Sequence, residues 1–224
     1  PALAVAVVAF LVVWAAWEWI AGLVLAGASG LVAVRLIWWA APGAVLARLG
    51  ATPAGPARAP RAHNLLDGLC VAAGLAKPSL YVIDDGSANA LVVATDLRRS
   101  SLVVTSGLLT RLSRIELEGA LAHQLARVKS GAVLPATVAA LLVGPLVRGV
   151  GPAAGATPDG TDLDDLGAVV LTRYPPGLAG ALARIEEVGS GPPVSGVGAR
   201  MTARLWLAPP GGHLGDRVEA LRDL

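Results

Sequence analysis

The stretch ALAHQLARVKSG, residues 120–131, is the part of the chain from which the rest is interpreted. Upstream of it, Ser113 and Glu116 have the S-x-x-E spacing that is typical of a capping box at the start of a helix. Apolar residues then recur at helical spacing, at Ile115, Leu121, Leu125 and Val128. The sequence therefore predicts a helix that begins near Ser113 and carries one histidine, His123.

The neighbours of His123 decide what chemistry this helix can perform. An HExxH zinc helix needs two histidines four residues apart and a glutamate after the first as general base. Here Gln124 follows His123, and Arg127 stands four residues after it. Glutamine has no basic group near neutral pH, and arginine carries a permanent positive charge. Taken alone, one histidine on a helix is more often a packed or surface residue than a metal ligand.

The composition indicates a protein that lies partly in a membrane. The 224 residues have a mean hydropathy of +0.64, and only 15% of them are charged. A net charge of +2 is too small to argue for a nucleic-acid partner. The single cysteine, Cys70, excludes an internal disulfide framework and a cysteine-rich zinc site. The bias to Ala, Gly, Val, Pro and Arg suggests a bacterial source.

Residues 1–41 are almost entirely apolar, with Glu18 and Arg35 as their only charges. They are long enough for two spans of about 20 residues each. The GASG stretch at 27–30 is the best turn signal between two such spans. We expect a transmembrane helical hairpin that is truncated at its N-terminus. The alternative, a core hairpin of a soluble protein, is disfavoured because nothing downstream is large enough to cover it.

Residues 42–62 are rich in Pro, Ala and Arg, which is typical of a linker. Arg48, Arg58 and Arg61 follow the second expected span. By the positive-inside rule, these cations place the following domain in the cytoplasm. The expected location is therefore the bacterial cytoplasmic (inner) membrane, with membrane lipid as a partner and the soluble domain facing the cytoplasm.

The remaining residues, 63–224, alternate between extended runs and helical patterns. Extended runs bounded by turn residues lie at 79–85, 89–95 and 101–109. Helical spacing marks 63–75, two segments within 165–188 that are broken at YPPG, and 213–224. We expect an α+β fold, mainly α, with a small sheet. The apolar run 131–147 is slightly short for a span, and we expect a buried or membrane-surface helix there.

Five separated blocks resemble the HtpX-like membrane zinc metallopeptidases in order and spacing. The blocks are HNLLDGLCVAAGLAKPSLYVID, LYVIDDGSANALVVATD, LVVTSGLLTRLSRIELEGALAHQLARVKSG, DDLGAVVLTRYPPGLAGAL and the closing ARLWL…HLGDRVEALRDL. The resemblance covers roughly residues 45–224. It implies a gluzincin-like domain behind membrane segments, with zinc as the cofactor of active members.

The resemblance also assigns a role to single positions. His123 stands at the first zinc-ligand position, Gln124 at the glutamate base, and Arg127 at the second histidine ligand. The third ligand of the family is the Glu of an E-x-x-A-D block. Here that block is TDLDD, with Thr161 at the Glu position and Asp165 at the second-shell Asp. Two of three ligand positions and the base are therefore substituted.

A peptide-binding edge is also implied by the resemblance. Asn89, Ala90 and Leu91 match the family's N-A-F segment, whose strand resembles a substrate-binding edge. Unpaired backbone groups on such a strand can capture an extended peptide by strand addition. The alternative is an ordinary edge strand that is already capped.

Arg127 is expected to compensate acidic residues near the vacant ligand positions. We expect it to pair with Asp165 or, failing that, with Asp164, and so to link two helices without zinc. The alternative is an exposed arginine that continues a solvated face with Arg114 and Lys129.

Two function hypotheses follow from these substitutions. The favoured one is a membrane-anchored, catalytically inactive homologue that binds peptides or membrane-protein segments, or acts as a scaffold or regulator, with no cofactor. The alternative is an active membrane zinc metalloendopeptidase in protein quality control that uses non-standard ligands. A decaying gene without function is a third possibility.

Overall fold

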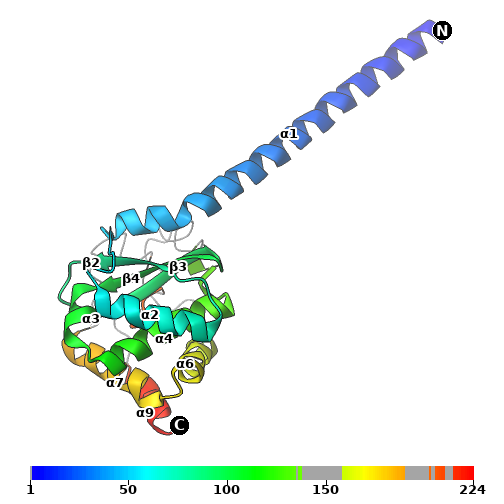
Figure 1. The fold of residues 1–224 in the computed structure, drawn as a ribbon. Helices are drawn as coiled ribbons and strands as arrows, with labels where there is room; N and C mark the ends of the chain where they lie inside the picture. The colour runs from blue at the N-terminus through cyan, green and yellow to red at the C-terminus, as the bar shows by residue number, and fades with distance from the viewer. Residues whose placement is uncertain (1, 135, 138–157, 190–201, 203–204, 210–213) are drawn as a thin grey trace. The chain divides into compact units, whose positions relative to one another are not determined.

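The computed structural model describes residues 2–134, 136–137, 158–189, 202, 205–209 and 214–224. The chain divides into two compact units, Pro1–Ala40 and Ala41–Leu224, which we describe separately (Figure 1). The described residues are mainly helical and contain a four-stranded sheet. The predicted α+β, mainly α, fold class is confirmed.

Helix α1 runs without a break over Ala2–Arg48, so the hairpin predicted for residues 1–41 is wrong. The Ser29 hydroxyl donates to the Ala26 carbonyl at 2.9 Å, so this polar residue finds its partner inside the helix. Each glycine of GASG costs only about 1 kcal/mol relative to alanine in a helix interior. Within α1, Gly22–Arg48 is long and apolar enough to cross a membrane by length and composition.

The predicted linker, residues 42–62, is instead part of the folded second unit. The last turns of α1 bury Ala41, Val45 and Leu46, and α1 is followed by β1 (Thr52–Pro53). Ala54 and Ala59 are also buried. Alanine and proline cost little side-chain entropy when they are buried, which explains why a segment with linker composition packs here.

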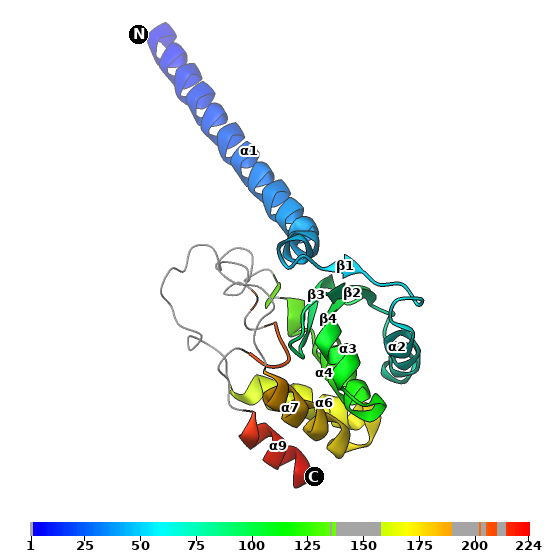
Figure 2. The same cartoon turned by 90° about the vertical axis from the view of Figure 1, so that its left-hand side faces the viewer.

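The sheet has the strand order β1-β2-β4-β3, so β3 lies at one edge (Figure 2). Strand β2 (Ser79–Ile83) pairs in parallel with β4 (Arg99–Thr105), and β3 (Ala90–Asp96) pairs with β4 in antiparallel fashion. The three predicted extended runs are confirmed, although the end of the third forms the short helix α3 (Ser106–Arg111).

Helix α4 (Arg114–Ser130) is the central helix of the second unit. It packs against α2 (Pro60–Ala73), α6 (Pro158–Thr172) and α7 (Pro175–Val188), and α7 packs against α9 (Gly215–Arg222). The predicted capping box is confirmed, because Ser113 N donates to Glu116 Oε2 at 2.7 Å and Glu116 N donates to Ser113 Oγ.

The apolar run 131–147 is described only at its start. Val133 is buried, and the Thr137 hydroxyl donates to the Val133 carbonyl oxygen at 2.8 Å. The same hydroxyl accepts from Ala94 N of β3 at 3.2 Å. Residues 138–147 lie outside the described residues, so a membrane-associated helix over 131–147 stays a prediction.

Candidate functional site

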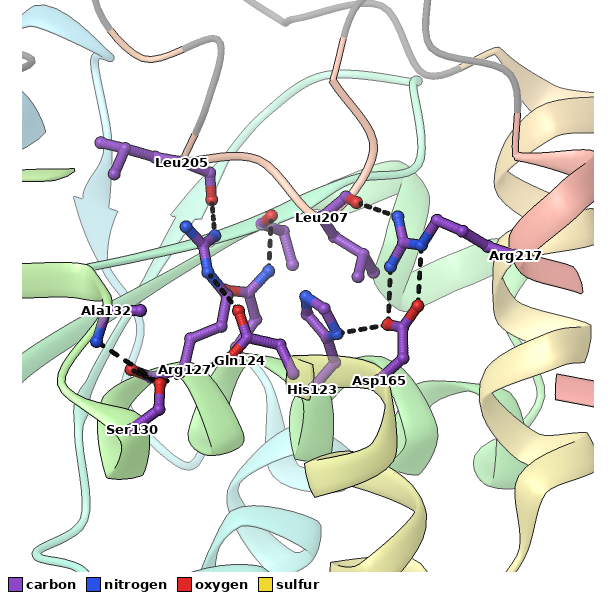
Figure 3. Close-up of polar contacts among 11 residues, drawn as sticks. His123, Gln124, Arg127, Ser130, Ala132, Asp165, Leu205, Leu207 and Arg217 are labelled. Atoms are coloured by element: carbon purple, nitrogen blue, oxygen red, sulfur yellow. Dashed lines mark hydrogen bonds and ion pairs between the residues drawn. The ribbon is translucent and has the colours of Figure 1, made fainter. Parts of the chain in front are cut away.

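Helix α4 places His123, Gln124 and Arg127 together in the interior. All three are buried. In Figure 3 their side chains point from α4 toward the segment that carries Leu205 and Leu207. The helical spacing therefore brings these three positions to one site, as in an HExxH helix. Gln124 and Arg127 stand there in place of the glutamate and the second histidine.

His123 contacts Asp165, the residue that the resemblance matches to the Asp of the family's E-x-x-A-D block. Its Nδ1 lies 2.8 Å from Oδ1 of Asp165 on α6. Burial lowers the pKa of His123, and it outweighs the opposite effect of the Asp165 carboxylate. The imidazole is therefore neutral near pH 7. This contact favours the tautomer with its proton on Nδ1, toward Asp165.

Asp165 is held in turn by Arg217 of α9, a residue that the sequence reasoning missed. Arg217 donates from Nε to Oδ2 at 2.8 Å and from Nη2 to Oδ1 at 2.7 Å (Figure 3). Burial alone would raise the pKa of Asp165, but the contacts with His123 and Arg217 outweigh it and lower the pKa. The sequence signal for a nearby cation was the excess of acidic residues at the start of α6. This signal did not indicate which arginine pairs with Asp165.

Arg127 pairs with Asp164, the second of its two predicted partners. Its Nε lies 3.5 Å from Asp164 Oδ2, and both side chains are only 10% exposed. The first choice, Asp165, is wrong because Arg217 and His123 already contact both of its oxygens. The solvated-face alternative is also wrong, because Arg127 is buried.

Another donor of Arg127 reaches the chain's own backbone. Its Nη1 donates to the Leu205 carbonyl at 2.7 Å. Burial lowers the pKa of Arg127 and raises that of Asp164. The Ser130 hydroxyl donates to Asp164 Oδ1 at 3.3 Å and so supports the carboxylate.

Gln124 forms a hydrogen bond with the sheet. Its side chain is fully buried, and Nε2 donates to the Ala90 carbonyl of β3 at 3.0 Å. Its Oε1 is buried without a hydrogen-bond partner among the described residues. The side chain at the base position thus links α4 to the edge strand.

The edge of β3 is occupied by the chain itself at the residues that were expected to be open. Leu207 N donates to Ala90 O at 2.7 Å, and Leu91 forms an antiparallel bridge with Trp206. The Asn89 amide brackets Ala208, with Nδ2 donating to Ala208 O at 2.8 Å and Oδ1 accepting from Ala208 N at 3.2 Å. The expectation of unpaired groups at Asn89–Leu91 is therefore wrong, because residues far along the chain pair with them.

The described side chains do not fit a zinc ion. Within the described part of the chain, no three His, Cys, Asp or Glu side chains are grouped to hold a metal. His63, a possible substitute ligand, is used elsewhere, with Nε2 2.8 Å from the Ala54 carbonyl. Thr161 and Asp162 lie in α6, but their side chains are outside what the structure describes.

Comparison with known proteins places the chain beside one group of proteases. The chain matches proteins named "Protease HtpX homolog": 45% identical over 84 residues in Dictyoglomus thermophilum and 34% over 102 residues in Thermoanaerobacter pseudethanolicus. Over these stretches the chain is similar to the HtpX protease homologues. A third relative with the same name, from Listeria innocua, is 29% identical over 134 residues. No family model matches the chain.

The match covers only part of each protein. The three matched stretches are 38%, 46% and 59% of this chain, and 28%, 34% and 43% of the respective relatives. The chain thus spans less than half the length of the curated relatives it matches. Their activity as whole proteins can therefore come to this chain only as a proposal.

Proposed function

We propose that the chain is a membrane-anchored, catalytically inactive homologue of the HtpX-like zinc metalloendopeptidases, and that it serves as a peptide-binding, scaffold or regulatory module. The observation that carries the proposal is the engagement of Arg127. A buried guanidinium stands where a ligand imidazole would be, bonded to Leu205 O and paired with Asp164. A fixed cation at this place opposes the binding of a second one.

The base position supports the same conclusion. A general base needs a lone pair that takes up a proton near neutral pH, and a carboxamide has none. Gln124 is also turned toward β3, where its Nε2 bonds the Ala90 carbonyl. Its amide serves to join two elements and not to orient a water molecule.

The residues around the site act as a cross-link between helices. His123 on α4, Asp165 on α6 and Arg217 on α9 form one buried chain of contacts. Arg127 and Asp164 make a second link between α4 and α6. Together they hold the helices together without a metal ion, as a binding module or scaffold would require.

The proposed location is the bacterial cytoplasmic membrane, with the second unit facing the cytoplasm. Gly22–Arg48 supplies a sufficient apolar length, and Arg48, Arg58 and Arg61 follow its end. Arg58 forms an exposed ion pair with Asp84 at 3.0 Å, which reduces its share in this signal.

Metal content and proteolysis test the proposal. We expect far less than about one zinc per chain after purification without added metal, where a catalytic site would hold one ion. We also expect no chelator-sensitive cleavage of casein. The matched comparison is Gln124→Glu combined with Arg127→His, which restores the HExxH letters. Stoichiometric zinc in the unaltered chain that disappears in His123→Ala would overturn the proposal.

A further inference from the structure

Helix α6 lies at the outside of the second unit and exposes an apolar face (Figure 1). Leu163, Leu166 and Val170 are 67%, 45% and 74% exposed. They follow one another at three- and four-residue spacing, which aligns side chains along one face of a helix. Asp164 and Asp165, which pair with residues of α4, fall on the other face. An exposed apolar row of this kind indicates an interaction surface.

Two further apolar residues lie at the C-terminal end of α6. Tyr174 and Ile115 are 50% and 53% exposed. Both approach Gly177, where a Cβ would lie 3.3 Å from Ile115 Cγ2 and 3.5 Å from Tyr174 Cδ1. The α6 patch is defined here as the five exposed apolar residues Leu163, Leu166, Val170, Tyr174 and Ile115.

Arg173 follows the last turn of α6 in a conformation that favours glycine. Its φ is 55°, the one positive value among the described residues other than glycine. Its N donates to Val169 O at 2.7 Å and so closes the helix, at a place where glycine is usual. The Arg173 side chain is exposed and has no ion-pair partner among the described residues. Turn geometry alone would favour glycine here, which points to a role for the guanidinium group itself.

The charges and apolar residues along α6 are complementary to those of a second copy. Asp159 lies in the first turn of α6, and Arg173 follows its last turn. Two copies of α6 that pack antiparallel can place Leu166 against Leu166. The same register sets Leu163 against Val170, and it sets Asp159 against Arg173. Acid therefore meets base at both ends and apolar residues meet between them, as a two-fold interface between identical surfaces requires.

Membrane lipid fits this face less well than a second copy does. Residues 158–172 contain four aspartates and no lysine or arginine. Helices that bind at the surface of a membrane carry basic residues on their polar face, which attract anionic lipid. An acidic helix is repelled by the negative surface of the cytoplasmic leaflet.

We propose that the α6 patch is a self-association surface, on which two copies of this chain pack antiparallel along α6. The apolar contacts supply the affinity, and an Arg173–Asp159 pair at each end sets the orientation, because exposed charges at the rim of an interface act mainly on specificity. The inference is independent of the proposed function, since the patch lies on the face of α6 that does not contact α4. Association requires neither the presence nor the absence of zinc.

Cysteine cross-linking of the full chain in bacterial membranes tests the contact at Leu166. Leu166→Cys places two thiols at the two-fold axis, where facing Cα atoms of closely packed helices lie within the separation of about 4.4–6.8 Å that a disulfide spans. With copper phenanthroline and oxygen, we expect most of this variant to run at doubled mass on a non-reducing gel. The unaltered chain, with the buried Cys70 alone, gives the background.

The matched control is Val71→Cys on α2, a position that is 84% exposed. This variant should stay at the mass of a single chain, because α2 is outside the proposed interface. Equal cross-linking at positions 71 and 166 would overturn the proposal, and so would the absence of cross-linking at position 166. A face of α6 that is covered by lipid would give the second of these results.

Charge reversal in the Leu166→Cys chain tests whether the partner is a second copy. Arg173→Asp and Asp159→Arg each place like charges across both ends of the interface, and each should weaken association by about tenfold. Aspartate tolerates the left-handed backbone at position 173, so this variant is expected to fold. Melting temperatures of the purified variants check folding independently of association.

Co-expression of the two reversed chains, each with a different tag, completes the test. Every acid then meets a base again, so cross-linking between the two tags should return to the level of the chain with neither reversal. Cross-linking that the single reversals leave unchanged, or that co-expression does not restore, would overturn the antiparallel pairing. Zinc binding or casein cleavage by the chain would refute the proposed function and leave these results as they are.

Discussion

At the scale of the residue, the buried charges of the site are paired with one another. Arg127 stands beside Asp164, and Arg217 is paired with Asp165, so two guanidinium groups face two carboxylates. Removing ions from water is costly unless each finds a partner. The neutral His123 adds a polar contact to Asp165 without adding charge.

Replacing Arg127 with alanine should destabilise the fold strongly. The substitution leaves the buried carboxylate of Asp164 without its cation and removes the donor to Leu205 O. Breaking a buried pair on one side typically costs about 3–5 kcal/mol. Urea denaturation of the detergent-solubilised chain measures the change in the free energy of unfolding.

The matched control is Arg184→Ala, which breaks the exposed pair with Glu187 on α7. Exposed pairs contribute about 0–1 kcal/mol, so this variant should remain close to the unaltered chain. A loss of less than about 1 kcal/mol for Arg127→Ala would mean that its pair with Asp164 is not a stabilising link.

His123 should make stability fall as the solution is acidified below pH 6.5. Its pKa in the folded chain lies below the ordinary value of 6.5, because burial disfavours the imidazolium. Between these two pKa values the unfolded chain binds more protons, so the free energy of unfolding decreases as pH falls. Asp164, whose pKa is raised above 3.8, acts in the opposite sense as pH falls toward 3.8.

Denaturation of the unaltered chain at pH 7.5 and 5.5, compared with His123→Gln, isolates this contribution. The variant lacks the titrating imidazole and should lose less stability between the two pH values. Identical pH dependence in the two chains would contradict the assignment of a buried, neutral His123.

At the scale of the element, the site depends on how closely α4 approaches α7. A Cβ on Gly119 of α4 would lie 2.5 Å from Leu178 N and 2.7 Å from Gly177 C, both backbone atoms of α7. Backbone atoms cannot move aside as the end of a flexible side chain can. Only glycine therefore permits the two helices to meet at this distance.

Gly119→Ala should destabilise the chain by about 1–3 kcal/mol, the usual cost of overpacking, despite the better helix propensity of alanine. The comparison is Gly68→Ala in α2, where no atom lies within 4 Å of the added Cβ. That substitution should stabilise the chain by up to about 1 kcal/mol. Thermal denaturation of both variants measures the direction of each change in stability. An unchanged stability of Gly119→Ala would contradict the close approach of α4 and α7.

At the scale of the whole molecule, the apolar helix is long enough to cross a membrane by length and composition. Most apolar side chains of residues 22–40 are exposed, including that of Trp39 at 74%. Exposed apolar surface of this extent is typical of a segment surrounded by lipid. The second unit, in contrast, has its own buried core.

Fusions to the C-terminus should report a cytoplasmic domain. Expressed in bacteria, a green fluorescent protein fusion should fluoresce, and an alkaline phosphatase fusion should be inactive, since phosphatase needs the disulfides formed outside the cytoplasm. Changing Arg48, Arg58 and Arg61 to glutamine should weaken this orientation, because basic residues near the end of a span set it. An active phosphatase fusion of the unaltered chain would reverse the proposed topology.

The features that the sequence by itself determined are local ones. The capping box at Ser113 and the three extended runs came from short patterns whose physics acts between near neighbours. The resemblance added the edge position of β3 and matched Asp165 to the Asp of the family's E-x-x-A-D block. The structure brings Asp165 to 2.8 Å from His123. Residues 2–41 continue as one helix in spite of the turn signal at GASG, because two glycines cost little in an otherwise apolar helix.

Only the tertiary structure decided which partners meet across long separations. Arg217 reaches Asp165 from 52 residues away, and Asn89 bonds Ala208 from 119 residues away. No periodicity in the sequence encodes such contacts, since they follow from the packing of α9 and of the 205–208 segment onto elements formed far earlier in the chain. The occupied edge of β3 therefore becomes visible only once the core has brought these residues together.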